Sequence, residues 1–107
     1  MAMTLEDFKA ARRVLDGVIS PTHLVHSPAF SAASGNQVYL KPENLQVTGA
    51  YKIRGATYKI STLTEEQRQR GLITASAGNH AQGVAMAAQK AWCRAVIFMP
   101  TTTPLVK

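Results

Sequence analysis

The chain has 107 residues, of which 46% are hydrophobic and 17% are charged, and its formal net charge is +6. This composition is typical of one globular domain and argues against a disordered chain. The lysines and arginines are scattered along the sequence, without interleaved aromatics or a basic arm. That distribution argues against a nucleic-acid partner. The excess of basic charge fits a protein that handles anionic small molecules, or one whose acidic remainder is missing.

We expect neither a membrane span nor a secretion signal from this sequence. Its apolar runs are far shorter than the roughly 20 residues of a membrane span, and its first residues lack the apolar region of a secretion signal. The single cysteine, Cys93, excludes an internal disulfide. We therefore expect a cytoplasmic protein with no membrane segment, in which Cys93 is a buried structural thiol.

Residues 1–19 are predicted to form an amphipathic helix. Thr4 and Asp7 resemble a capping pair, and apolar residues then recur every three or four positions. Gly17 fits the end of this helix.

Residues 20–50 are predicted to contain little regular structure. Prolines and small polar residues indicate an extended segment, with a turn at 34–36. A short strand is predicted at 37–41, and a loop follows at 42–50. This loop is long for a connection, and long loops are often functional.

The second half of the chain alternates between helical and strand patterns. Apolar residues recur with helical period from Tyr51 to Leu63, and a capping-box sequence then opens a short helix that Gly71 closes. Three elements follow, namely a strand at 72–76, a helix at 80–91 and a strand at 94–99. Together with the strand before Tyr51, this order predicts the α/β class, with a parallel sheet covered by helices.

The last residues, "TTTPLVK", resemble the start of a helix, with Thr103 as the N-cap and Pro104 at the first helical position. Only four residues follow the cap, which is too few to sustain a helix. We therefore expect residues 1–107 to be one incomplete α/β segment, the N-terminal part of a longer protein.

The stretch "SAGN", residues 76–79, joins a predicted strand directly to a predicted helix. The free N–H groups of a helix start, with the Ser76 and Asn79 side chains beside them, form an anion site, and Gly78 permits a sharp turn. An ordinary turn capped by Ser76 or Asn79 explains the stretch equally well. The loop lacks the glycine patterns of dinucleotide and phosphate-binding loops, so a nucleotide is not the favoured ligand.

Lys52 stands at the predicted start of a helix, which is the least favourable end for a cation. In a βαβ arrangement, this start and the start of the helix after "SAGN" open toward the same edge of the sheet. A lysine that lies near helix dipoles and away from water can be a neutral amine, able to form a Schiff base with an aldehyde cofactor such as pyridoxal phosphate. For an isolated lysine, the simpler interpretation is a solvated surface residue.

"TGAYKIRGA" followed by "SAGNHAQG", with "KPEN" before them and "AVIFMP" after them, resembles a known family. These motifs are similar to the N-terminal part of the pyridoxal-phosphate-dependent threonine dehydratases (threonine ammonia-lyases) and serine dehydratases of fold type II. The resemblance implies the N-terminal portion of the two-domain, tryptophan synthase β-like fold. Ile53 and His80 point to the dehydratase and racemase branch.

The resemblance assigns three residues to the cofactor, pyridoxal phosphate. Lys52 would hold it covalently and later take the α-proton of the substrate, and Asn79 would hydrogen-bond its ring hydroxyl oxygen. Tyr51 would place an aromatic ring near it. In this family Ser-Phe is common where Ala50 and Tyr51 stand, which leaves the substrate preference open.

Ser76, Gly78, Asn79 and His80 would bind the substrate carboxylate, through side chains and main-chain N–H groups. The implied reaction is deamination of L-threonine to 2-oxobutanoate, or of L-serine to pyruvate, with release of ammonia. The implied partner is thus a small amino acid, and the full-length family proteins usually form homo-oligomers. Two alternatives stay open: a serine racemase or serine dehydratase of the same fold, and a non-catalytic truncated chain.

The family's phosphate-binding glycine loop and its partner for the pyridine nitrogen are expected beyond Lys107. On this basis, the 107 residues alone are expected not to hold the cofactor in a competent geometry. A metal site is not expected, because one cysteine and three histidines without carboxylates at ligand spacing make a poor ligand set.

Three other features are expected to be structural. Trp92 is predicted to pack at the end of a helix, and Arg54 to form a salt bridge. Gly83 and the alanines that follow it are predicted to allow close packing of a helix on the sheet.

Overall fold

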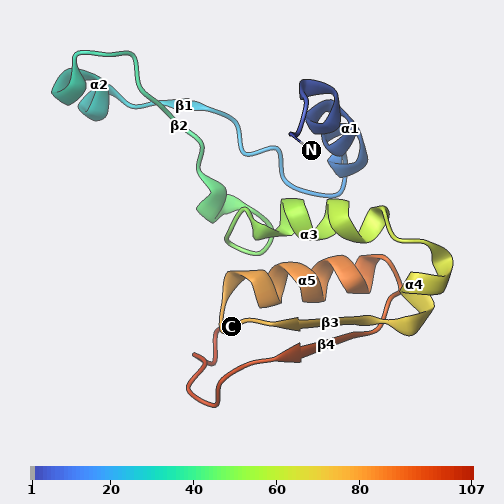
Figure 1. The fold of residues 1–107 in the computed structure, drawn as a ribbon. Helices are drawn as coiled ribbons and strands as arrows, with labels where there is room; N and C mark the ends of the chain where they lie inside the picture. Colours follow the sequence, from blue (N-terminus) through green and yellow to red (C-terminus); the bar gives the residue numbers. More distant parts are fainter. Residues whose placement is uncertain (1) are drawn as a thin grey trace.

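In the computed structural model, which describes residues 2–107, two parallel strands carry two successive layers of helix (Figure 1). Strands β3 (Leu72–Ala75) and β4 (Ala95–Phe98) pair in register from Leu72 opposite Ala95 to Ala75 opposite Phe98. Helix α5 (Asn79–Lys90) contacts both strands, and helix α3 (Lys52–Ser61) packs on α5. The α/β class and this parallel pair, both expected from the alternating pattern, are confirmed.

The core lies between α3 and α5. Ile53, Ala56 and Ile60 form the buried face of α3 at the spacing of a helical stripe, and they pack with Val84 of α5. Gly83 of α5 lies against the backbone of α3, which corrects its expected role in packing on the sheet. Ala87 and Ala88 belong to the same buried cluster, against which strand residues also pack, whereas Ala85 is exposed.

Local capping signals place the ends of the other helices. Helix α1 (Leu5–Leu15) begins at a capping box formed by Thr4 and Asp7, and it packs on α3. Helix α4 (Glu65–Arg70) begins at a second capping box, formed by Thr64 and Gln67. It ends at Gly71, whose φ of 83° lies in the region that favours glycine.

Residues 28–34 form a helix, α2 (Pro28–Ser34), where the sequence predicted an extended segment. Ser27 caps its first turn and Pro28 occupies the first helical position, which is a start signal that the surrounding prolines and serines concealed. The helix ends at Gly35, with φ of 68°.

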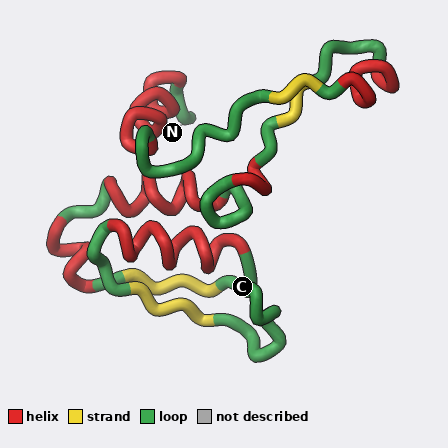
Figure 2. Tube along the Cα trace, turned by 180° about the vertical axis from the view of Figure 1, so that it is seen from behind, coloured by secondary structure: helices red, strands yellow, loops and turns green. Residues whose placement is uncertain are grey.

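The strand predicted at 37–41 is short and does not join the parallel sheet. Strand β2 (Tyr39–Leu40) pairs antiparallel with β1 (Val25–His26), and the 3-10 turn η1 (Glu43–Leu45) follows. Figures 1 and 2 show that β1, α2 and β2 form an arm that extends away from the packed helices. Only the strands at 72–76 and 94–99 therefore form the expected parallel pairing.

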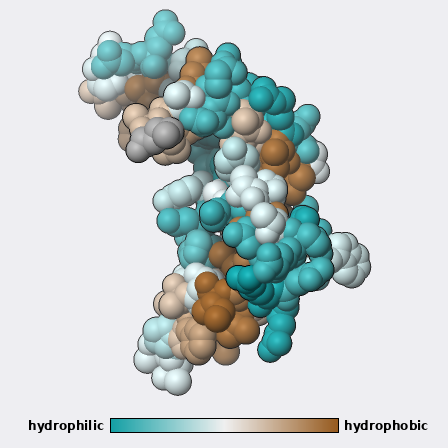
Figure 3. Space-filling view, turned by 45° about the vertical axis from the view of Figure 1, so that its right-hand side comes forward, coloured by the Kyte–Doolittle hydropathy of each residue, from teal (hydrophilic) through white to brown (hydrophobic). Residues whose placement is uncertain are grey.

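Helices cover one face of the β3–β4 sheet, and the other face is exposed. Ile73 retains 78% and Phe98 62% of its accessible surface. Figure 3 shows apolar side chains at the surface at the level of these strands.

Trp92 does not pack against the protein, contrary to expectation, since it is 97% exposed. The chain reverses directly after α5, where the N–H of Cys93 donates to the Ala88 carbonyl, and Trp92 occupies the left-handed region at φ of 52°. This turn directs the indole outward. It also brings Cys93 into the core, which confirms the expected buried thiol.

Within residues 2–107, no helix has the length and apolar character to traverse a membrane. The same residues contain no group of three or more histidine, cysteine, aspartate or glutamate side chains that could hold a metal ion.

Candidate functional site

Helices α3 and α5 both begin at the end of the sheet where β3 and β4 terminate (Figure 1). Their starts are in direct contact, because a Cβ added at Gly83 of α5 would lie 3.0 Å from the carbonyl carbon of Lys52 and 3.1 Å from the Ile53 nitrogen. Gly83 lies one helical turn after Asn79. The backbone of Lys52 and the start of α5 are thus neighbours.

Lys52 is the first residue of α3, and its side chain is exposed. Its Nζ lies 5.1 Å from the centroid of the Tyr51 ring, a distance at which a cation and an aromatic face attract each other. The expectation that this lysine lies away from water is therefore wrong for the described chain. The amine is accessible to a molecule from solution.

The Ser76–His80 segment leaves backbone donors free at the start of α5. Ser76 Oγ accepts a hydrogen bond of 3.2 Å from the Gly78 N–H, and no side chain caps the helix. The amides of Asn79 and His80 have no acceptor within residues 2–107. Of the two interpretations of "SAGN", the geometry disfavours the capped turn and leaves donors for an anion.

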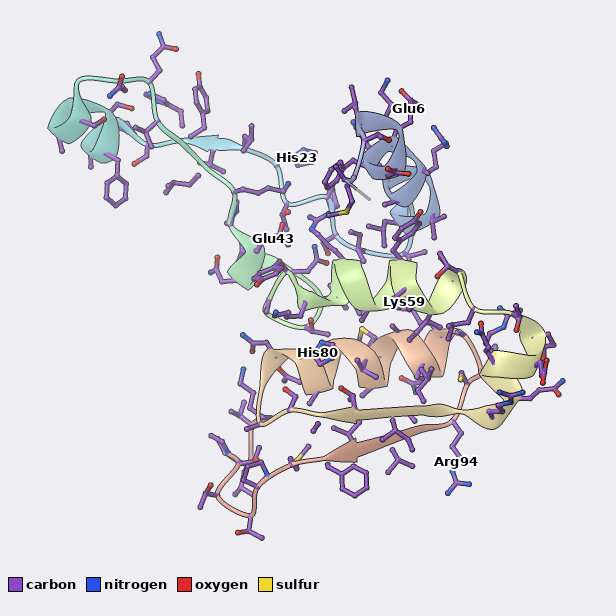
Figure 4. The ribbon with its side chains drawn as sticks, in the orientation of Figure 1. Glu6, His23, Glu43, Lys59, His80 and Arg94 are labelled. Carbon is purple, nitrogen blue, oxygen red and sulfur yellow. The ribbon has the colours of Figure 1, made fainter. Side chains whose placement is uncertain are left out.

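The side chains around this helix start have partners elsewhere. His80 Nε2 lies 3.1 Å from Thr74 Oγ1 in β3, and Figure 4 shows His80 at the start of α5. Asn79 Oδ1 accepts a hydrogen bond of 2.6 Å from Lys107 Nζ. Nothing in the sequence pointed to Lys107, because it lies 28 residues from Asn79.

The loop before Lys52 is held by a salt bridge that sequence reasoning found only in part. Arg54 donates to both carboxylate oxygens of Glu43, from Nε and from Nη2, each at 2.8 Å. Nη2 also donates to Thr22 Oγ1 at 2.9 Å. The expected structural salt bridge of Arg54 is confirmed, whereas Glu43 and Thr22 were not predicted as its partners.

The salt bridge strongly lowers the pKa of the Glu43 carboxyl. Hydrogen bonds from Arg54 lower the pKa of the Glu43 carboxyl from 4.5 to about 2, against the opposing effect of burial. The same contact raises the pKa of Arg54. Glu43 is therefore ionised throughout the neutral range and keeps Arg54 paired.

Gln46 anchors the other part of this loop. This residue is buried, with 4% of its surface exposed. Its Oε1 accepts a hydrogen bond of 2.9 Å from the Ser20 N–H, and its Nε2 donates one of 2.8 Å to the Ser20 carbonyl. Sequence reasoning missed Gln46, since its partner lies 26 residues away.

An open groove of about 620 Å³ runs beside α5, lined in part by Thr48, Gln82, Ile97 and Lys107. Its lining includes neither Lys52 nor Asn79. The groove adjoins the two helix starts without containing the predicted site residues.

The sequence of this chain is similar to those of known proteins. Residues 15–107 match the sequence model of the family described as "Pyridoxal-phosphate dependent enzyme". The L-threonine ammonia-lyase of Thermotoga maritima is 54% identical over 105 residues, which cover 98% of this chain and 26% of that protein.

Solved structures are also similar. Maize serine racemase superposes with a TM-score of 0.90 at 33% identity, over 98% of this chain and 32% of that one. The processed form of threonine deaminase isoform 2 from Solanum lycopersicum gives a TM-score of 0.78 at 39% identity, over 98% of this chain and 30% of that one. The chain thus spans about a quarter to a third of the length of these proteins.

Proposed function

Because the chain belongs to the family of pyridoxal-phosphate dependent enzymes, we propose that it supplies the lysine and the carboxylate-binding loop of an ammonia-lyase acting on L-threonine and L-serine. The observation that carries the proposal is the contact between Gly83 and the Lys52 backbone. It brings an accessible amine and a helix start with free amides to one end of the fold.

The residues present fit the cofactor of this family. Lys52 offers an exposed primary amine, Tyr51 an aromatic ring beside it, and Asn79 a carboxamide at the neighbouring helix start. When bound, pyridoxal phosphate supplies an electron sink for the substrate carbanion. The Lys107 ammonium engages only Oδ1 of Asn79, so the Nδ2 donors of this side chain remain available for the cofactor's ring hydroxyl oxygen.

The protein's own contribution is proton transfer and orientation. The Lys52 amine takes the α-proton once it is free, acting as the general base. The amides at the start of α5, together with Ser76 and His80, bind the substrate carboxylate, and the helix dipole favours this negative charge. Loss of the β-hydroxyl and hydrolysis then give 2-oxobutanoate from threonine, with ammonia.

We propose this activity for a polypeptide that combines the chain with the further segments its relatives possess. The test is a chimera in which this chain replaces the matching segment of the Thermotoga maritima ammonia-lyase, to which it is 54% identical. The chimera is expected to absorb visible light with its cofactor bound and to form 2-oxobutanoate. Borohydride reduction followed by mass spectrometry should locate the cofactor on the peptide that contains Lys52.

Lys52→Ala in the chimera should abolish both the cofactor adduct and turnover. Lys59→Ala is the matched control, because Lys59 is an exposed lysine in the last turn of the same helix. An adduct that persists in Lys52→Ala, or an inactive chimera with correctly bound cofactor, would contradict the proposal.

Serine racemase is the second candidate, favoured by the TM-score of 0.90 with the maize enzyme. Serine turnover by the chimera separates the two. D-serine formation with little 2-oxobutanoate from threonine would support the racemase, and the reverse supports the lyase. A homo-oligomer in the complete protein is a further expectation, to be checked by light scattering of the chimera.

A further inference from the structure

We propose that the Glu43–Arg54 pair is a positioning clamp for Lys52, which fixes the backbone of this residue while its side chain stays free in solvent. The inference rests on the proposed function, because it concerns how the lysine of that site is held. Neither Glu43 nor Arg54 is placed in contact with substrate or cofactor.

The first turn of α3 needs such a device because it has no ordinary cap. Tyr51 stands at the N-cap position, and its side chain makes no capping hydrogen bond. Instead, Arg54, two residues after Lys52, donates from Nε and Nη2 to the Glu43 carboxylate in η1. A planar fork bonded to both oxygens of a carboxylate restrains orientation as well as distance.

Other contacts make the clamp rigid. Thr22 bonds to both members, since its hydroxyl accepts from Arg54 and donates to Glu43. Lys41 Nζ donates to the Thr22 carbonyl at 2.7 Å. Gln46 holds the same loop to Ser20. Figure 4 shows Glu43 beside the start of α3.

Helix α5 supports the opposite side of the Lys52 backbone. The close approach at Gly83 leaves no room for a side chain between the two helices. The Lys52 backbone is therefore held from two sides, by the clamp and by α5, whereas the Lys52 side chain is exposed to solvent.

This arrangement suits a lysine that has to react at a defined place. A long side chain has many rotamers, and its reach is defined only when its own backbone is fixed. Because a misplacement of about 1 Å can cost as much as 100-fold in rate, loss of the clamp is expected to act on the chemical step.

The test uses the chimera with Glu43→Gln, Arg54→Lys and the double variant Glu43→Gln/Arg54→Lys. We expect kcat to fall roughly 10- to 100-fold when normalised to bound cofactor, with little change in KM for threonine. Arg54→Lys keeps the charge but loses the fork, so it too should be impaired. The double variant should be no worse than the worse single variant, because the two residues act as a unit.

Glu66→Gln is the matched control, because it breaks an exposed glutamate–arginine pair of α4, Glu66–Arg70. A second measurement follows amide hydrogen exchange at residues 45–54 in the 107-residue chain itself, where the N–H groups of Gly49 and Arg54 donate to the carbonyls of Gln46 and Tyr51. Exchange there should rise in Glu43→Gln and not in Glu66→Gln.

Two results would overturn the clamp. One is a kcat per bound cofactor in Glu43→Gln equal to that of Glu66→Gln; the other is unchanged exchange at residues 45–54. If Lys52→Ala retains turnover, the proposed function fails instead, whatever the clamp variants do.

Discussion

Two loops deliver the two helix starts of the candidate site, and they are held in different ways. The loop before Lys52 is anchored by side chains from distant parts of the sequence, with Glu43 bonded to Arg54 eleven residues away and Gln46 bonded to Ser20 26 residues away. The loop before Asn79 has one local side-chain bond, from the Gly78 N–H to Ser76 Oγ. Backbone bonds also hold it, from the Ser76 N–H to the Phe98 carbonyl and from the Gln82 N–H to the Gly78 carbonyl.

The difference in anchoring corresponds to the groups that each loop offers to a ligand. The first presents one long side chain, so its backbone has to be fixed by other groups. The second presents its own backbone amides, and each bond made to them within the protein would remove a donor from a ligand. Strong anchoring suits the first loop, whereas sparse bonding suits the second.

Gly83→Ala should have the largest effect, because it breaks the contact that both loops depend on. The added Cβ would meet three backbone atoms of Lys52 and Ile53 at 3.0 to 3.2 Å, and backbone atoms cannot rotate away. We expect the free energy of unfolding of the chain to fall by about 2–3 kcal/mol, measured by urea denaturation.

Gly55→Ala is the control for this prediction. Gly55 also lies inside a helix, but a Cβ there meets nothing within 4 Å. The substitution should stabilise the chain by up to about 1 kcal/mol, because alanine favours the helix. Equal effects of the two substitutions would show that α3 and α5 do not approach as closely as described.

Acid should weaken the first loop and leave the second unchanged. The pKa of Glu43 is lowered from 4.5 in the unfolded chain to about 2, so its stabilisation is complete above pH 4.5 and is lost as the pH falls toward 2. The shift corresponds to about 3 kcal/mol, and partial exposure of the pair reduces this to roughly 1–2 kcal/mol. The protection factors of residues 43–51, which correct for the intrinsic pH dependence of amide exchange, should therefore fall between these pH values, with those of residues 76–79 unchanged.

The Glu43→Gln variant provides the comparison for the acid titration. Hydrogen bonds from Thr4 also lower the pKa of Asp7, so some loss of stability in acid is expected from α1 in any variant. The part of the pH dependence that belongs to the loop should disappear in Glu43→Gln. If wild type and variant lose stability in parallel, the salt bridge does not hold this loop.

The sequence was sufficient where structure is set by neighbouring residues. The capping boxes at Thr4 and Thr64 and the three- and four-residue apolar spacing of α3 predicted these helices close to their observed bounds. The order of helices and strands predicted that α3 and α5 begin at the same edge of the sheet. The sequence therefore placed Lys52 and Asn79, the first residues of these helices, near each other.

The sequence was insufficient where a partner lies far away or a local signal is ambiguous. Glu43 and Gln46 act through partners that no local pattern identifies. The helix after Ser27 was missed because Ser-Pro is a signal both for a turn and for a helix start. Trp92 was expected to be buried by virtue of its size, but the tight turn after α5 turns it outward.

Ser76→Ala should have the smallest effect on stability and yet a clear effect on function. The Ser76 hydroxyl accepts one part-buried hydrogen bond from the Gly78 N–H. The backbone bond from the Ser76 N–H to the Phe98 carbonyl is unaffected by the substitution. The free energy of unfolding should fall by about 1 kcal/mol or less. In the chimera, loss of a group proposed to bind the substrate carboxylate should raise KM for threonine about tenfold, the equivalent of one such hydrogen bond.

Ser61→Ala is the matched control, because the Ser61 hydroxyl donates to the Tyr58 carbonyl at the far end of α3. It should cost a similar small amount of stability and leave KM unchanged. If Ser76→Ala destabilises the chain as much as Glu43→Gln, the second loop is as firmly anchored as the first, and the contrast between them is wrong. If KM is unchanged while stability falls, Ser76 shapes the turn and the amides of α5 bind the carboxylate without its help.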